Sequence, residues 1–68
     1  MTLGEKLSQY RRTSGMTQQE LGERLNISAQ AISKWENDLS EPDISTLKKL
    51  SELFDISMAE LLDIEDKK

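Results

Sequence analysis

The sequence predicts an all-α domain made of five short helices. Apolar residues recur at spacings of three and four along most of the chain, which is the period of a helix, and no stretch alternates with a period of two. A residue that favours a helix start precedes each apolar stretch. With 68 residues the chain forms one domain with a small core, because a domain of this size buries only about 60% of its unfolded surface.

The helix starts follow from the capping residues. In a capping box, the hydroxyl of the first residue accepts a hydrogen bond from the backbone N–H three residues later. The glutamate at that later position accepts a hydrogen bond from the backbone N–H of the first residue. The pairs that fit are Thr2 with Glu5, Thr17 with Glu20, and Ser57 with Glu60. The third and fourth helices have the N-cap residues Ser28 and Asp43, and Pro42 stops an earlier helix from continuing. The expected helices are residues 2–12, 17–25, 28–37, 43–54 and 57–63.

Each expected helix carries one apolar stripe that we assign to the core. In chain order the stripes are Leu3, Leu7 and Tyr10; Leu21 and Leu25; Ala31, Ile32 and Trp35; Ile44, Leu47, Leu50 and Phe54 with Leu53 beside them; and Met58, Leu61 and Leu62. Trp35 is assigned to the core, and we attach no function to it. Leu62 and Ile64 fit either the core or a dimer surface. Residues 1–64 form the expected domain, and residues 65–68 form a polar tail.

The connection between the second and third helices is predicted to be a tight reversal. Only Asn26 and Ile27 separate the second helix from the cap Ser28, and asparagine tolerates the left-handed backbone conformation. Gly22 lies in the middle of the second helix, where glycine costs roughly 1 kcal/mol relative to alanine. We infer that Gly22 has a packing role and lets the third helix approach closely.

Composition argues against several classes of function. The chain contains no Cys and no His, which removes disulfides, thiolate zinc sites and the commonest general base. No apolar run approaches the ~20 residues needed to span a membrane, and no secretory leader is visible. The expected protein is soluble and cytoplasmic, uses no cofactor or metal, and is not an enzyme.

The net charge of −4 is unevenly distributed. Residues 1–37 carry five Lys and Arg against four Glu, a balance of +1, and residues 38–68 carry four Lys against nine Asp and Glu, a balance of −5. An anionic partner is therefore expected on the first half and not on the second. The cations that could face such a partner are Arg11, Arg12 and Lys34, with Lys6 and Arg24 as further candidates.

The expected third helix has an unusual outer face. Opposite its core stripe it carries short, mostly uncharged and hydrogen-bonding side chains, whereas an ordinary solvated helix face would be rich in Glu and Lys. These residues are Ala29, Gln30, Ser33, Lys34 and Asn37. Gln30 or Lys34 alone is common on exposed helices, so their joint placement is the informative observation.

Residues 17–37, "TQQELGERLNISAQAISKWEN", resemble the helix-turn-helix of the Xre family, the Cro and CI type of bacterial and phage regulators. "LSQYRRTSGMTQQELGERL" is similar to the family's first two helices, and "EPDISTLKKLSELFDISMAELL" to its last two. Gln18 and the small Gly22 match the family pattern, whereas Asn26 replaces the usual glycine. The resemblance covers nearly the whole chain and implies a compact five-helix, lambda-repressor-like fold.

The resemblance also implies how the chain would contact DNA. The third helix would enter the major groove, where short and amide side chains meet base edges. Base contacts are expected from Ala29, Gln30, Ser33 and Lys34. Phosphate contacts are expected from Arg11, Thr17, Gln18, Ser28 and Asn37. Arg11 would also pair with Glu36. The alternative for this pair is a purely structural role, and the alternative for Gln18 is a solvated residue at a helix start. The loop 38–41 is acidic where phage repressors are often basic, which argues against phosphate contacts there.

The implied function is sequence-specific binding of double-stranded DNA by a transcriptional regulator, with repression expected. The implied partners are a near-palindromic operator and a second copy in a homodimer. Two other classes stay open. One is a protein-binding module whose acidic second half docks a basic partner, which co-purification would reveal. The other is the N-terminal domain of a longer chain with an enzymatic or ligand-sensing part, which the gene beyond Lys68 would show.

Overall fold

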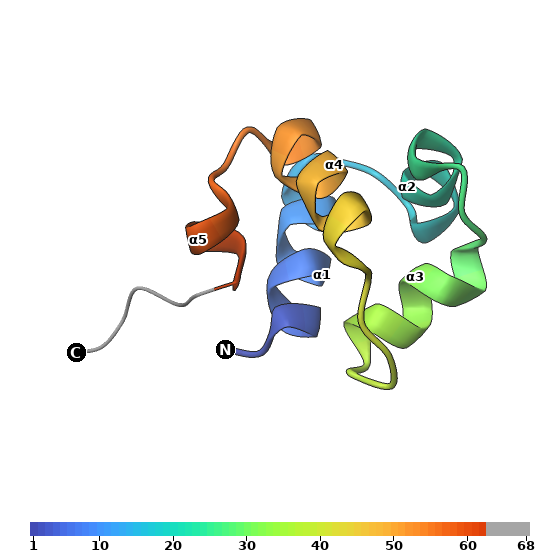
Figure 1. Cartoon of the computed structure of the whole chain (residues 1–68). Coiled ribbons are helices and arrows are strands. Elements are labelled where there is room, and N and C mark those ends of the chain that lie inside the picture. Colours follow the sequence, from blue (N-terminus) through green and yellow to red (C-terminus); the bar gives the residue numbers. More distant parts are fainter. Residues whose placement is uncertain (63–68) are drawn as a thin grey trace.

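The computed structural model describes residues 1–62, which form five helices (Figure 1). They are α1 (Leu3–Thr13), α2 (Gln18–Leu25), α3 (Ala29–Glu36), α4 (Ile44–Phe54) and α5 (Met58–Leu62). This confirms the all-α fold, with helix bounds shifted by one residue at several ends. Ser28 and Asn37 cap α3 from outside. The last residue of the fifth expected helix, Ile64 and the expected tail all lie outside the described residues.

Side-chain caps begin each helix as the sequence indicates. Complete capping boxes start α1 and α2, at Thr2 and Thr17. At α3, α4 and α5 a side-chain oxygen of Ser28, Asp43 or Ser57 accepts a hydrogen bond from the backbone N–H three residues on. The capping box expected for Ser57 and Glu60 is thus present only in this half among the hydrogen bonds of residues 1–62. Hydrogen bonds from Thr46 lower the pKa of Asp43, because they favour its ionised form.

The core lies among all five helices. Its buried members are Leu7, Leu21, Leu25, Ile32, Trp35, Leu47, Leu50 and Leu61, all from the expected stripes. Tyr10 of α1 stacks on Phe54 of α4 with ring centroids 5.6 Å apart. Trp35 is 8% exposed, which confirms its assignment to the core. Leu62 is partly buried against this core, which favours a core role for it.

One core assignment is wrong. Ile44 is 64% exposed, although it continues the spacing of the fourth stripe. It is the first residue of α4, one turn before Leu47, so it precedes the part of the helix that packs against the core.

The helices divide around α1. In Figure 1, α2 and α3 lie on one side of α1 and α5 lies on the other, next to the end of α4. The same division appears in the packing, since α1 contacts both α3 and α5. Among residues 1–62 no helix combines the length and apolar character that crossing a bilayer requires. The fold therefore presents α3 on a side of the molecule that α5 does not cover.

Candidate nucleic-acid interface

The turn between α2 and α3 has the geometry that its sequence predicts. Asn26 adopts a left-handed conformation with φ 61°, and the Ile27 N–H donates to the Gly22 carbonyl at 2.7 Å. A Cβ atom on Gly22 would lie 2.4 Å from the Ile27 carbonyl oxygen, far inside van der Waals contact. The absence of a side chain at Gly22 thus allows the turn to fold back onto α2, which confirms the expected close approach.

The outer face of α3 projects away from the core. Ile32 and Trp35 are 1% and 8% exposed on the inner face, whereas Gln30 and Lys34 are exposed on the opposite one. Within residues 1–62, neither Gln30 nor Lys34 has a side-chain hydrogen bond. Ala29 and Ser33 lie beside them on the helix and are partly exposed. All four residues expected to contact bases therefore lie on one face, and the two long side chains are free to bind.

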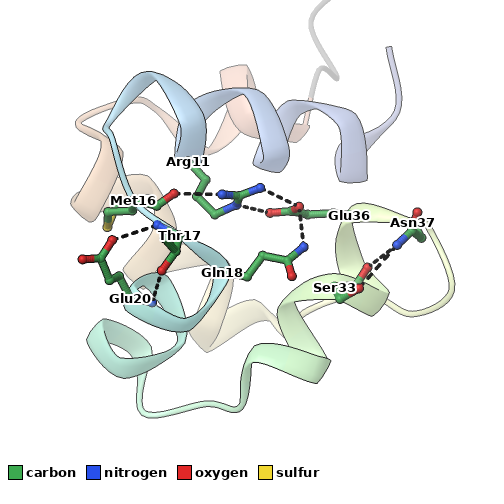
Figure 2. Close-up of polar contacts among 8 residues, drawn as sticks. All are labelled: Arg11, Met16, Thr17, Gln18, Glu20, Ser33, Glu36 and Asn37. Atoms are coloured by element: carbon green, nitrogen blue, oxygen red, sulfur yellow. Dashed lines mark hydrogen bonds and ion pairs between the residues drawn. The ribbon is translucent and has the colours of Figure 1, made fainter.

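The side chain of Asn37, an expected phosphate contact, is hydrogen-bonded within the end of α3. Its amide nitrogen donates to the Ser33 carbonyl at 2.9 Å and lies 3.5 Å from the Ser33 hydroxyl (Figure 2). The Asn37 side chain is thus directed back along α3. A phosphate contact by this amide requires it to exchange at least one of these hydrogen bonds.

Both helices of the motif begin with free backbone donors. Within residues 1–62, the first two N–H groups of α2 and of α3 have no hydrogen-bond partner, and such groups favour an anion. The hydroxyls of Thr17 and Ser28 accept from the helix and keep their own hydrogens for donation. Glu20 accepts from the Thr17 N–H at 2.9 Å, so α2 begins beside a carboxylate, whereas the first turn of α3 has no acidic residue. The start of α3 is therefore the more favourable of the two for a phosphate.

A polar cluster joins α1, α2 and α3 behind this face (Figure 2). Arg11 donates to both carboxylate oxygens of Glu36, from Nε at 2.6 Å and from Nη2 at 3.1 Å. Arg11 Nη1 also donates to the Met16 carbonyl at 2.8 Å, and Gln18 Nε2 donates to Glu36 Oε1 at 3.0 Å. The side chains of Arg11 and Glu36 are only 11% and 7% exposed. The expected pairing of Arg11 with Glu36 is confirmed as a largely buried, bidentate ion pair.

The cluster sets the ionisation of Glu36. Burial raises the pKa of the Glu36 carboxyl, but the hydrogen bonds from Arg11 and Gln18 and the charges of Arg11 and Arg12 outweigh it, so the pKa is lowered overall. Glu36 is therefore anionic at neutral pH. The arrangement also limits what Arg11 and Gln18 can do elsewhere. Arg11 uses three of its five N–H groups inside the protein, and Gln18 uses one of its two amide hydrogens.

Two features of the interface were missed by sequence reasoning. Lys6, a candidate cation for DNA, donates instead from Nζ to the Glu60 carbonyl and joins α1 to α5. Asp38, considered only as part of an acidic loop, accepts hydrogen bonds from Thr2 and from the Gly4 N–H. Both contacts join residues more than 30 positions apart, for which local patterns give no signal. The glycine in the first turn of α1 was the one available sign of a close approach there.

Comparison with known proteins agrees with this geometry. A family model described as helix-turn-helix matches residues 7–61. The HTH-type transcriptional regulator ImmR of Bacillus subtilis (strain 168) is 44% identical over 62 residues, which is 91% of this chain and 49% of ImmR. The HTH-type transcriptional activator BcrR of Enterococcus faecalis is 41% identical over 66 residues, which is 97% of this chain and 32% of BcrR. The chain thus spans half or less of these relatives.

Solved structures show the same fold in complexes with DNA. The P22 c2 repressor in complex with a synthetic operator matches with a TM-score of 0.85 and 32% identity, over 91% of this chain and 94% of the repressor chain. SinR, a master regulator for biofilm formation, in complex with DNA matches with a TM-score of 0.79 and 31% identity, over 88% and 97% of the two chains. The chain belongs to the helix-turn-helix family of transcriptional regulators, the Xre type that its sequence resembles.

Proposed function

We propose that this chain binds double-stranded DNA sequence-specifically by inserting α3 into the major groove, and that it thereby regulates transcription in the cytoplasm. The family consists of DNA-binding regulators and not of enzymes. The observation that carries the proposal is the outer face of α3, where Gln30 and Lys34 extend free of the protein while Ile32 and Trp35 anchor the helix. Repression is the expected effect, by likeness to the P22 c2 repressor.

The chemistry of the face assigns a role to each residue that reads bases. Gln30 can make a bidentate pair with adenine, and Lys34 can donate to guanine O6 and N7. Ala29 can contact a thymine methyl group, and Ser33 can hydrogen-bond to bases of either class. Gln30 and Lys34, the second and sixth residues of α3, would therefore supply the two bidentate base contacts.

Phosphate contacts would position the domain without reading sequence. The free N–H groups at the start of α3, with the Ser28 hydroxyl, are the best-formed donors, and Thr17 and Gln18 add donors at the start of α2. Arg11 would contribute only through the two N–H groups that remain free of Glu36 and Met16, because its guanidinium is largely buried and its charge is paired with Glu36. The Asn37 side chain would contact a phosphate after its amide gives up the hydrogen bond to the Ser33 carbonyl.

A mutational test separates base reading from general affinity. Gln30→Ala and Lys34→Ala should each cost roughly 1–3 kcal/mol on the selected site and relax preference at one base pair. Gln9→Ala and Lys49→Ala are matched controls, since these residues are exposed on α1 and α4. The measurement is competition binding on single-base variants of a site selected from random oligonucleotides. Unchanged base preference in both α3 variants would contradict the proposal.

We further infer that the protein acts as a homodimer on a near-palindromic operator. One recognition helix reads only a few base pairs, and a two-fold dimer that reads half-sites about one helical turn apart doubles the contacts. Footprinting should show two related half-sites. Protection of a single half-site by a monomer would contradict the dimer and leave the role of α3 intact.

A further inference from the structure

The turn after α3 is joined to the start of α1 by a carboxylate. Asp38 follows the C-cap Asn37, and its side chain accepts from the Thr2 hydroxyl at 2.8 Å and from the Gly4 backbone N–H at 3.1 Å. The first N–H groups of a helix have no partner within it, and a carboxylate there is also favoured by the helix dipole. Asp38 therefore caps α1 from the far end of the recognition helix.

The backbones of α1 and α3 come very close at this point. A Cβ atom on Gly4 would lie 2.3 Å from the Trp35 carbonyl oxygen and 2.9 Å from the Glu36 carbonyl oxygen. It would also lie 2.6 Å from Asp38 Oδ1. The last turn of α3 thus rests directly on the first turn of α1, and Gly4 makes room for it.

Asp38 adopts a left-handed backbone conformation in the turn after α3. Its φ is 60°, an uncommon conformation for a residue with a Cβ atom. Aspartate tolerates this conformation better than most residues with a side chain, and Asp55 adopts it as well. The two hydrogen bonds to α1 distinguish Asp38 from Asp55, whose carboxylate has none within residues 1–62. The same bonds pair the carboxylate with α1, although Asp38 itself is an exposed residue.

We propose that Asp38 is a positioning residue, which fixes the C-terminal end of the recognition helix on α1 and so sets the angle at which Lys34 meets its base. This rests on the proposed function of α3. The helix has eight residues and is about 12 Å long, and the Leu39 N–H donates to the Lys34 carbonyl at 2.9 Å. Gly22 holds the other end of α3 through the turn at Ile27. Asp38 thus acts beside the Arg11–Glu36 pair in holding the C-terminal end of α3. Lys34 is the base-reading residue nearest to Asp38 in the chain, so releasing Asp38 should affect Lys34 most among those residues.

A purely electrostatic role for Asp38 predicts the opposite result. An acidic residue beside the expected DNA surface would repel phosphates, so its removal would tighten binding to any duplex. A positioning role predicts weaker binding to the operator, even though a negative charge is lost. The sign of the effect therefore separates the two explanations.

Asp38→Gly is the test, and Asp55→Gly is its matched control. Asp55 is an exposed C-cap residue of α4 with φ 58°, and its carboxylate has no hydrogen bond within residues 1–62. Both variants remove one negative charge and place glycine in a left-handed position. Asp38→Gly should weaken operator binding roughly tenfold, or about 1.4 kcal/mol, and flatten discrimination at the base pair that Lys34 reads. Asp55→Gly should leave discrimination unchanged. Equal behaviour of the two variants would overturn the proposal.

Two further measurements keep the outcome decisive. If Asp38→Gly fails to fold, Asp38→Asn replaces it, because asparagine retains one acceptor oxygen. Asp38→Asn should show a smaller loss of operator binding. Tighter or unchanged operator binding would overturn the proposal. Amide exchange at Gly4 reports on the contact without DNA, and it should accelerate in Asp38→Gly but not in Asp55→Gly. If the wild-type protein has no preferred DNA site, the proposed function fails, whereas unchanged exchange at Gly4 refutes the contact itself.

Discussion

The polar cluster behind α3 predicts a large loss of stability when its carboxylate is removed. Glu36→Ala deletes the acceptor of two hydrogen bonds from Arg11 and one from Gln18. It leaves the Arg11 guanidinium, which is 11% exposed, without its counter-ion. The substitution therefore creates an unpaired and mostly buried charge, which is far more costly than the loss of a surface ion pair.

The expected cost is a large fraction of the total stability. Breaking a buried ion pair by removing one partner typically costs about 3–5 kcal/mol. A chain of 68 residues has a free energy of unfolding of roughly 3–10 kcal/mol at 0.05–0.15 kcal/mol per residue. Glu36→Ala is therefore expected to leave the domain marginally folded at 25 °C.

Urea denaturation followed by circular dichroism measures this cost. Glu52→Ala is the control, because Glu52 is an exposed glutamate of α4, and its removal should change the free energy of unfolding by less than about 0.5 kcal/mol. The double substitution Arg11→Met with Glu36→Leu should recover much of the loss, since an apolar pair leaves no buried charge. A cost below about 1 kcal/mol for Glu36→Ala would show that solvent screens the pair and would refute the reasoning.

The same pair predicts a dependence on pH. The pKa of Glu36 in the folded protein is below its ordinary value of 4.5, so the folded state binds a proton less readily than the unfolded state. The stabilisation is therefore complete above about pH 4.5, and it is lost as the pH falls through the lower, folded pKa. The difference in stability between the wild type and Glu36→Gln should shrink over that range. A difference that stays constant down to pH 3 would contradict the lowered pKa.

Three further predictions concern packing and charge. Gly22→Ala should destabilise the domain by about 1–3 kcal/mol in urea melts, because its Cβ would lie 2.4 Å from the Ile27 carbonyl oxygen. Lys6 and much of Arg11 are engaged within the protein, so Arg12, Arg24 and Lys34 remain to neutralise phosphates. The slope of the logarithm of the DNA-binding constant against the logarithm of salt concentration should therefore be near −2 to −3 per subunit. A slope steeper than −4 would contradict this assignment. Asp55→Asn and Glu60→Gln neutralise two exposed acids of the second half of the chain. At low salt these substitutions should tighten binding to random duplex DNA more than binding to the operator. Loss of operator binding would instead place these acids in the interface.

The sequence allowed much of the fold to be predicted because the decisive signals are local. Capping residues such as Thr17 lie within three positions of their partners, and Asn26 fits a left-handed turn by its own conformational preference. Periodicity identifies which face of a helix is apolar, but not where along its length the neighbours begin to cover it. That limit explains the wrong assignment of Ile44 to the core.

The candidate site was predicted in outline and less well in detail. The outer face of α3 follows from helical spacing, and the family resemblance supplied the pairing of Arg11 with Glu36. The engagement of Lys6 by α5 and of Asp38 by α1 depends on how distant segments meet in three dimensions. Gln18 also donates to Glu36, a contact that its position at a helix start does not reveal. A phosphate role assigned from position alone therefore overstates how many donors remain available.

The glycines at positions 4 and 22 have a consequence for how specificity can change. They bring the backbones of α1 and α2 against the two ends of α3, while Ile32 and Trp35 fix its inner face. The exposed side chains of Gln30 and Lys34 therefore contribute little to folding. A combinatorial library at these two positions should consist mostly of folded proteins, so new target preferences could arise by drift or by selection without passing through unstable intermediates. Structural support and sequence discrimination are thus encoded in separate sets of residues, which makes the domain a reusable scaffold.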